Sequence, residues 1–328
     1  MKTIRFTSAM MLVAIVLVGC AQVATPTPAP AAPTTAPVSA APTQPMATEL
    51  PTSTAVPQPT PVAQIPSGDL AQAGHLLFCT DFPYPPQEYY DQNGVPQGLD
   101  VEIGTEIANR LGLQVVYVNS MFDSIVEAVT SGKCDAIISA MNITAKRSIQ
   151  ISQIKYFQAG QSFVTVKGNP NKINTPMDLC GKSAAAESGT TEAAYLAGTD
   201  PYTGKGLTQQ CTAAGKQPVT VVVAQKDTDA LQMLQSGKVV VYSADSPVAA
   251  YYTVQHPDQF ELAAGGQVLE PALEGIGVPC GTASDCTNAP LSPVGAAIQA
   301  ALQSMMADGT YTQILTNWNL TTGAVTLP

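Results

Sequence analysis

The sequence predicts an α/β fold built from two successive units, each a parallel sheet with helices on its faces. Short runs of β-branched and aromatic residues alternate with segments in which apolar residues recur every three or four positions. This alternation is typical of parallel sheets. It begins near residue 75 and starts again near residue 183 in a chain of 328 residues, a length that suits about two domains.

The first unit contains three predicted strands separated by two helices. The strands are at 76–79, 115–118 and 136–138. We expect the helices to begin at Asp100 and Asp123, because an aspartate side chain can accept the free amide hydrogens of a first turn. Both helices carry apolar residues at helical spacing, namely Ile103, Ile107 and Leu111 in one and Ile125, Val126 and Val129 in the other.

The second unit repeats the pattern. Strands are predicted at 183–185, 219–224 and 239–243, and helices at 190–196 and 228–235. Ser-Gly-Lys precedes a strand in both units, at 131–133 and at 236–238. This match indicates either an internal repeat or a turn that is common between helices and strands.

Residues 1–20 are typical of a secretory signal. Lys2 and Arg5 precede an apolar run at 9–18, which is shorter than the 20 or so residues that span a bilayer. The ending Leu-Val-Gly-Cys resembles a bacterial lipobox, in which Cys20 is lipidated and becomes the mature N-terminus. The alternatives are an ordinary signal with a chance cysteine and an uncleaved anchor.

Residues 21–66 are predicted to form a disordered tether. They contain 12 prolines, 11 alanines and 9 threonines, and Glu49 is their one charged residue. Such a composition cannot bury a core. Since no later segment has about 20 apolar residues, we expect an extracytoplasmic domain anchored through Cys20 to the outer face of the cytoplasmic membrane, in the periplasm or at the cell surface.

The charge and the histidines exclude several kinds of partner. The net charge of −10 argues against nucleic acid and anionic lipid headgroups, which require lysine and arginine patches. The two histidines, His75 and His256, are too far apart in the sequence for a histidine-rich zinc or iron site. We therefore expect no metal and no cofactor.

The ends of the predicted strands are candidate ligand-binding segments, because ligands of open parallel sheets lie beyond the carboxyl ends of the strands. In the first unit these ends are residues 80–81 and 139–140, and in the second they are 186–191 and 244–245. Two such sheets that face each other would enclose a cleft lined by all four segments.

Several residues near these ends suit a zwitterionic ligand. Arg147 can bind a carboxylate with two parallel hydrogen bonds, residues 188–191 offer amides and hydroxyls, and Asp245 can receive an ammonium group. Phe122 can stack on an apolar side-chain stem. The alternatives are a solvated surface arginine, ordinary helix caps at 188–191 and Asp245, and a core phenylalanine.

Seven sequence motifs resemble those of the bacterial extracellular solute-binding proteins of family 3, the amino acid-binding components of ATP-driven uptake systems. They occur in family order between residues 76 and 318. They are TDFPYPP at 80–86, GLDVE at 98–102, SGKCDAIIS at 131–139, ITAKR at 143–147, GTT at 189–191, DSPVAAYY at 245–252 and ADGTY at 307–311.

The resemblance implies a two-lobed, type II periplasmic-binding-protein fold. Each lobe would hold a βαβ-based sheet, two crossovers would join the lobes, and the ligand cleft would lie between them. Lobe 1 would comprise residues 67–162 and 271–328, and lobe 2 residues 163–270.

The resemblance also implies roles for the cleft residues. Arg147 would bind the ligand α-carboxylate with nearby amides, Asp245 the α-amino group, and Tyr84 and Phe122 would flank the side chain. The complete set of implied ligand-binding residues is Asp81, Tyr84, Phe122, Ser139, Ala140, Met141, Asn142, Arg147, Gly189, Thr190, Thr191 and Asp245. The chain departs from the family pattern at Gln87, where many members have phenylalanine, and at Ala140, where some have serine.

The function implied is capture of a free amino acid without chemistry. The ligand would bridge the closing lobes of a monomer, which would then deliver it to an ABC permease. Two aspartates, Asp81 and Asp245, against Arg147 favour polar or basic amino acids. Alternatives are a ligand-sensing or adhesion module on the tether and an enzyme on the same scaffold, such as a cyclohexadienyl-dehydratase-like protein or a wall hydrolase. Such an enzyme would use Asp81, Glu88 or Glu187, but no Ser/His or Cys/His pairing is evident.

Seven cysteines divide into Cys20, assigned to lipid, and six that can form disulfides in an oxidising compartment. Six cysteines allow 15 connectivities. Cys280–Cys286 would close a short loop, and Cys180–Cys211 would clamp the second lobe. Cys79–Cys134 remains by elimination, on neighbouring strands whose register the sequence leaves open.

Overall fold

The computed structural model describes residues 61–281 and 283–327. The predicted signal, the lipidation of Cys20 and the tether as far as residue 60 lie outside these described residues. Within the described part of the chain, no helix is both long enough and apolar enough to cross a membrane.

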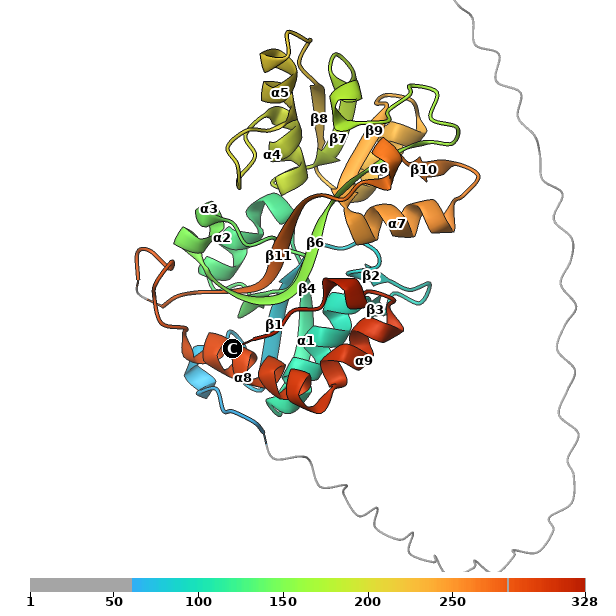
Figure 1. Cartoon of the computed structure of the whole chain (residues 1–328). Coiled ribbons are helices and arrows are strands. Elements are labelled where there is room, and N and C mark those ends of the chain that lie inside the picture. The colour runs from blue at the N-terminus through green and yellow to red at the C-terminus, as the bar shows by residue number, and fades with distance from the viewer. Residues whose placement is uncertain (1–60, 282, 328) are drawn as a thin grey trace, which may run out of the picture. The chain divides into compact units, whose positions relative to one another are not determined.

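One mixed sheet of nine strands runs through the described chain, in the order β4-β1-β5-β11-β6-β9-β7-β8 with β10 beside β6 (Figure 1). At one end, three strands pair in parallel: β1 (His75–Thr80), β4 (Gln114–Asn119) and β5 (Ala136–Ile137). At the other end, the parallel strands are β7 (Ser183–Glu187), β8 (Thr220–Ala224) and β9 (Val241–Asp245). The strand β10 covers Phe260–Leu262, and β2 (Tyr89–Tyr90) and β3 (Pro96–Gln97) form a separate hairpin.

Two long strands, β6 (Ser152–Val166) and β11 (Leu269–Val278), form the middle of the sheet and connect its two ends. They are antiparallel to each other, and each is antiparallel to its other neighbour, β9 or β5. The alternation of strands and helices in the sequence therefore predicts the parallel strands at the two ends of the sheet. It does not predict the antiparallel strands in the middle. The implied boundaries at 162/163 and 270/271 fall inside these two strands.

Helices cover both faces of the sheet at each end, and the alternation of side chains along the strands separates the two cores. We call β1, β4 and β5 with their helices lobe 1, and β7 to β10 with theirs lobe 2. The helices of lobe 1 are α1 (Leu99–Arg110), α2 (Ile125–Thr130), α3 (Ala145–Gln150), α8 (Pro293–Asp308) and α9 (Thr310–Asn317). Those of lobe 2 are α4 (Thr191–Ala197), α5 (Leu207–Ala213), α6 (Asp227–Gln235) and α7 (Ser246–Gln255). Short 3-10 helices lie at Ser67–Asp69, Phe122–Ser124, Pro176–Leu179, Ala264–Gly266 and Thr321–Gly323.

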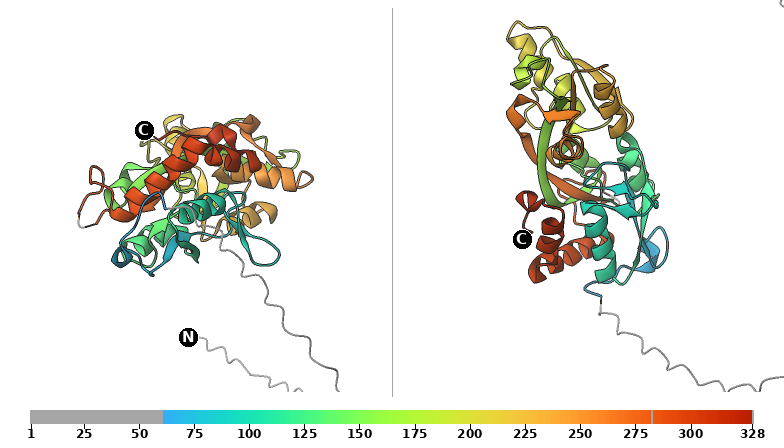
Figure 2. Two further views of the ribbon diagram at one scale, coloured as in Figure 1. Left: turned by 90° about the horizontal axis from the view of Figure 1, so that it is seen from below. Right: turned by 90° about the vertical axis from the view of Figure 1, so that its right-hand side faces the viewer.

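In lobe 1, Phe78 of β1 packs with α1, α8 and α9, whereas its neighbour Cys79 packs with α2. Figure 2 shows α8 and α9 lying next to α1. In lobe 2, Ala184 and Ala185 of β7 divide in the same way between a core with α4 and α5 and a core with α6 and α7. Each lobe is thus a three-layer α/β/α unit, so the strand ends are held by cores on both faces.

The predicted helix caps at Asp100 and Asp123 are wrong. The N-cap of α1 is Gly98, and Asp100 lies in the first turn, fully buried. Its carboxylate accepts hydrogen bonds from the Ala140 amide at 2.7 Å and from the Tyr156 hydroxyl. Asp123 lies in the 3-10 helix that precedes α2, whose N-cap is Ser124. Asp100 therefore accepts hydrogen bonds from distant segments and does not cap its own helix.

The two Ser-Gly-Lys segments form the same turn. Gly132 and Gly237 have φ of +78° and +74°, the left-handed region that glycine adopts most easily. The following Lys133 and Lys238 amides donate to carbonyls five residues back, at 3.0 and 2.9 Å. This agreement suits an internal repeat and equally a common way of ending a helix.

The packed part of the chain begins earlier than the predicted residue 67. The Val62 amide donates to the Arg110 carbonyl at 3.0 Å. Ala63 and Ile65 pack against the lobe 1 core. The predicted tether is therefore too long at its C-terminal end, because its last apolar side chains find an apolar surface to cover.

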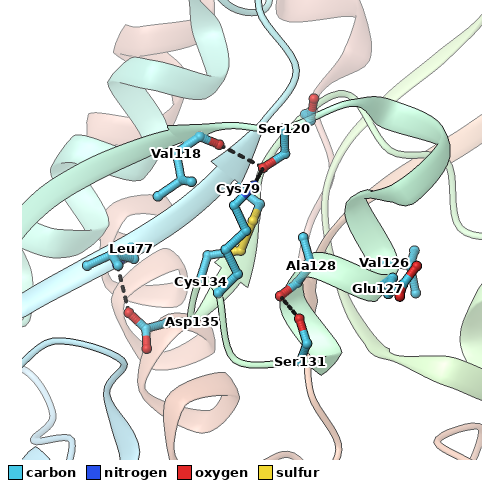
Figure 3. The surroundings of a disulfide bond; sticks show 12 residues. Leu77, Cys79, Val118, Ser120, Val126, Glu127, Ala128, Ser131, Cys134 and Asp135 are labelled. Atoms are coloured by element: carbon cyan, nitrogen blue, oxygen red, sulfur yellow. Dashed lines mark hydrogen bonds between the residues drawn. A yellow bond between two sulfur atoms is a disulfide. The ribbon is translucent and has the colours of Figure 1, made fainter. Parts of the chain in front are cut away.

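Three disulfides have the predicted pairings, namely Cys79–Cys134, Cys180–Cys211 and Cys280–Cys286. Figure 3 shows the first, which joins β1 to the segment that enters β5. Next to it, the Leu77 amide donates to the Asp135 carboxylate at 2.7 Å. The register of β1 and β5 does not prevent this disulfide, because Cys134 lies just before β5 and its Cα atom is 5.7 Å from that of Cys79.

Candidate functional site

A narrow cavity of about 10 Å³, with room for about one water molecule, lies where the strand ends of the two lobes meet. Seven of its twelve lining residues come from segments that the strand-end rule selects. The predicted residues that line it are Asp81, Tyr84, Phe122, Ser139, Ala140, Asn142, Thr190, Thr191 and Asp245. Three glutamates, Glu88, Glu187 and Glu192, complete the lining.

A second, more open pocket shares Phe122, Thr190 and Thr191 with the cavity. It contains the three remaining predicted residues, which do not line the cavity itself. These are Met141, Arg147 and Gly189.

The lobe 1 side of the cavity is built on the ends of β1 and β5. The Asp81 amide donates to the Ser139 hydroxyl oxygen at 2.9 Å, and that hydroxyl donates to Glu88 at 2.6 Å. Ala140 has φ of +42° and donates its amide hydrogen to the buried Asp100. Ala140 therefore has no side-chain hydroxyl to offer a ligand, and its backbone position is fixed by the hydrogen bond to Asp100.

The lobe 2 side is built on the end of β7 and the start of α4. Thr190 is the N-cap and accepts from the Ala193 amide at 3.2 Å, so the cap alternative holds for this residue. Thr191 instead donates to the Asn142 side chain of lobe 1 at 2.7 Å. Gly189 has φ of +80°, and a Cβ there would lie 2.7 Å from the Asp123 Cα. Glycine therefore permits the two lobes to approach closely at this point.

Asp245 ends β9 and stands at the N-cap position of α7, but its side chain makes no capping bond. Its Oδ2 atom instead accepts from the Tyr84 hydroxyl of lobe 1 at 2.9 Å. The side-chain cap alternative is therefore wrong for Asp245, a residue that is 4% exposed and lines the cavity.

Arg147 bridges the lobes at the edge of the cavity. Its guanidinium donates to the Asn142 carbonyl at 2.7 Å and to the Gly189 carbonyl of lobe 2 at 3.0 Å. The Arg147 Cζ atom lies 5.2 Å from the centre of the Phe122 ring, a cation–π distance. Burial lowers the pKa of Arg147, yet a guanidinium remains charged in proteins and has five N–H groups, more than these two bonds use.

The cavity is strongly acidic. Its lining contains five carboxyl side chains and neither lysine nor arginine. Glu88, Glu187 and Asp245 each have one buried carboxyl oxygen without a hydrogen-bond partner among the described residues. Burial, together with the negative charge of Asp81, raises the pKa of Glu187 to about 10. Burial also raises the pKa of Asp245 well above its ordinary value, and the nearby Glu192 adds to the rise. A cationic group in the cavity would relieve these costs.

Sequence reasoning considered Glu88 and Glu187 only as acids of a possible enzyme, and it missed Glu192 and Lys226. Lys226 follows the end of β8 and forms an ion pair with Asp81 of lobe 1. The strand-end rule would have selected it, had the rule been applied to the 219–224 strand as well. Glu192 has a weaker signal, its position next to Thr191 in the first turn of α4.

Gln87 does not line the cavity. Its side-chain amide donates to the buried Glu274 at 3.2 Å, so this departure from the family pattern adds to the polar network behind the cavity. Among the described residues, no group of three or more His, Cys, Asp or Glu side chains is arranged to hold a metal ion.

Comparisons with known proteins agree with this architecture. The arginine-binding protein ArgT of Corynebacterium glutamicum is 27% identical over 270 residues, 82% of each chain. The lysine/arginine/ornithine-binding periplasmic protein of Escherichia coli is 29% identical, over 71% of this chain and 82% of that one.

Solved structures are similar too. An ancestral arginine-binding protein bound to glutamine is 31% identical with a TM-score of 0.64, covering 76% of this chain and 99% of that one. An ancestral amino acid-binding protein described as a precursor of cyclohexadienyl dehydratase is 25% identical with a TM-score of 0.60, covering 75% and 95%.

The model of one family matches residues 76–321, about three quarters of the chain. The match includes all of β1 except His75, the two long crossover strands and both sides of the acidic cavity. The chain belongs to the bacterial extracellular solute-binding proteins of family 3.

Proposed function

We propose that this protein binds a free amino acid with a polar or basic side chain in the acidic cavity, without transforming it, and delivers it to an ABC permease. The observation that carries the proposal is the set of carboxyl oxygens that both lobes turn into the cavity and that have no hydrogen-bond partner within the described chain, next to one bridging arginine. The relatives named for arginine, lysine and ornithine, and the ancestral protein bound to glutamine, support the same ligand class.

The ligand α-carboxylate is assigned to Arg147. Its guanidinium is stacked on Phe122 and held by two backbone carbonyls, which fix its plane. The N–H groups that these bonds do not use can bind a carboxylate. Asn142 and Thr191, already joined across the lobes, stand at the same end of the cavity.

The ligand ammonium is assigned to Asp245. Tyr84 occupies Oδ2, whereas Oδ1 is buried without a partner among the described residues. An ammonium at Oδ1 would supply the missing hydrogen bond and the counter-charge. Both are worth most in a site from which water is excluded.

Capture would require the lobes to open and then close around the ligand, because the cavity of the described arrangement, about 10 Å³, is too small for an amino acid. Hydrogen bonds from Tyr84, Thr191 and Arg147 join lobe 1 to lobe 2 in the described structure. A ligand that touches both lobes binds the closed arrangement more tightly than an open one and so shifts the equilibrium toward closure. The hinge would lie in β6 and β11, which run between the lobes.

We also propose that the protein is a monomeric lipoprotein. Cys20 would carry the lipid, residues 21–61 would form the tether, and the binding domain would act outside the cytoplasmic membrane. Lobe 1 and lobe 2 would follow the boundaries within the two long strands.

An enzyme on the same scaffold is the second candidate. One observation favours it: Glu187, with a pKa of about 10, carries a proton at neutral pH and faces the cavity opposite Asp81. A buried, protonated carboxyl group is a candidate general acid.

Calorimetry separates the two candidates. The full-length protein, freed of bound ligand by unfolding and refolding, is titrated with the twenty amino acids and ornithine. We expect saturable heat with polar or basic amino acids and unchanged ligand on mass spectrometry afterwards. Heat with no amino acid would refute the binding function, and conversion of the ligand would favour the enzyme.

A further inference from the structure

Lys226 reaches across the cleft and contacts the other lobe. It stands between β8 and α6 in lobe 2, and its Nζ atom forms an ion pair with Asp81 of lobe 1. The same Nζ donates to the Phe82 carbonyl at 3.2 Å. The Lys226 side chain is 23% exposed and that of Asp81 is 5% exposed. A partly exposed lysine is thus paired with a buried carboxylate.

Both oxygens of Asp81 are occupied by protein groups. Lys226 contacts Oδ1, and the Phe122 amide donates to Oδ2 at 2.6 Å. By contrast, Glu187 and Asp245 each keep a buried oxygen without a partner among the described residues. The five carboxyl groups that line the cavity are therefore not equivalent, because Asp81 already holds a cation that belongs to the protein.

A ligand cation that is to use Asp81 must displace this lysine. The exchange replaces one ammonium by another cation, so it gains little Coulomb energy. The lysine is also attached to the protein, which gives it a high effective concentration at Asp81. An uncharged side chain needs no exchange, because it can lie beside the intact ion pair.

We infer that Lys226 is a specificity-determining residue, whose ammonium competes with the cation of a long basic ligand side chain for Asp81 and so favours uncharged polar side chains. The inference rests on the proposed binding of a free amino acid and assigns a cause to its side-chain preference. Removal of the lysine charge would leave Asp81 as a buried carboxylate facing Glu187, and a ligand cation would then be the available counter-charge.

The test compares two ligands of similar length. Kd values for L-arginine and L-glutamine are measured by calorimetry on the full-length protein and on Lys226→Met. The variant keeps a long apolar stem and removes the charge. We expect the ratio of the glutamine Kd to the arginine Kd to rise at least tenfold. Lys226→Arg, which keeps a cation at Asp81, should retain the wild-type ratio.

The ratio of the two Kd values separates competition for Asp81 from an effect of Lys226 on closure of the lobes. Loss of an ion pair between the lobes weakens every ligand by the same factor, which cancels in the ratio. The matched control is Lys238→Met, which removes an exposed lysine of lobe 2 outside the cavity lining and should leave the ratio unchanged. Adding Asp81→Asn to Lys226→Met should abolish the gain for arginine.

Each result has one meaning. An unchanged ratio in a folded Lys226→Met protein overturns the inference, since the lysine then serves only to join the lobes. If circular dichroism shows that this variant is unfolded, Lys226→Gln provides the same comparison. Absence of heat with all twenty amino acids and ornithine in the wild-type protein refutes the proposed function itself, which is a different failure, whereas absence of heat with arginine and glutamine alone overturns the inference.

Discussion

The Tyr84 hydroxyl of lobe 1 donates a 2.9 Å hydrogen bond to the Asp245 carboxylate of lobe 2 and accepts one, also of 2.9 Å, from the Asp245 amide. This pair holds one carboxyl oxygen of Asp245 against the opposite lobe and leaves the other in the cavity with no hydrogen-bond partner in the part of the chain that the structure describes. Closure of the lobes and orientation of the proposed ammonium ligand are thus achieved by the same residue pair.

Asp245→Asn should weaken binding of every free amino acid by about 30- to 150-fold. An amide cannot balance the ligand ammonium, and the loss of one charge-assisted hydrogen bond costs about 2–3 kcal/mol. Calorimetric titration measures the effect. Asp229→Asn, an exposed acid of α6, is the matched control and should bind as the wild type does. Equal affinities for Asp245→Asn and wild type would remove the ammonium assignment.

Arg147→Met should abolish the preference for ligands that carry an α-carboxylate over ligands that lack it. The wild type is expected to bind arginine at least 100-fold more tightly than agmatine, which lacks that carboxylate, because a buried arginine–carboxylate pair is worth about 3 kcal/mol or more. In the variant the two ligands should bind equally weakly. Lys146→Met changes an exposed neighbour and should keep the discrimination. A variant that still prefers arginine over agmatine would place the carboxylate elsewhere.

Binding of a basic amino acid should release a proton at pH 7.5. Burial and Asp81 raise the pKa of Glu187 to about 10, so its carboxyl is protonated in the ligand-free protein at this pH. A ligand cation in the cavity favours the ionised form and lowers that pKa, so the proton leaves. Titrations in buffers of different ionisation enthalpy count it.

The proton release should fade above about pH 10, where Glu187 has already ionised in the free protein. Glu187→Gln should remove the buffer dependence at pH 7.5. Glu127→Gln, at an exposed position, should leave it intact. Heats that do not vary with the buffer would show that the ligand cation does not approach Glu187.

The disulfides should differ in their contribution to stability. Cys180–Cys211 spans 31 residues and Cys280–Cys286 spans 6, so loop-closure entropy assigns them about 3.5 and about 2 kcal/mol respectively. Double alanine variants of each pair, compared by urea unfolding, should show this order. Neither pair lines the cavity, so both variants should keep the wild-type affinity. The reverse order of stabilities would contradict the entropic account.

Sequence periodicity predicted the features that depend on interactions between residues close together in the chain. The parallel strands at both ends of the sheet follow from alternating periodicity, and their carboxyl ends identify seven of the twelve residues that line the cavity. The caps show the limit. Thr190 caps its helix, whereas Asp245 at the same N-cap position bonds to Tyr84, and Asp100 in the first turn of α1 bonds to Tyr156. A side chain that has both a local and a tertiary partner available cannot be assigned from its neighbours alone.

The sequence by itself determined the α/β class, the family and the chemistry of the strand ends, because each depends on which residues follow one another along the chain and not on which distant residues meet. Only the tertiary structure decided which charges meet. Asp81 and Lys226 are separated by 145 positions, and no periodicity relates them. Their contact exists because β1 and β8 lie in different lobes whose carboxyl ends face each other. Which carboxylate remains free for a ligand is therefore a consequence of packing between the lobes.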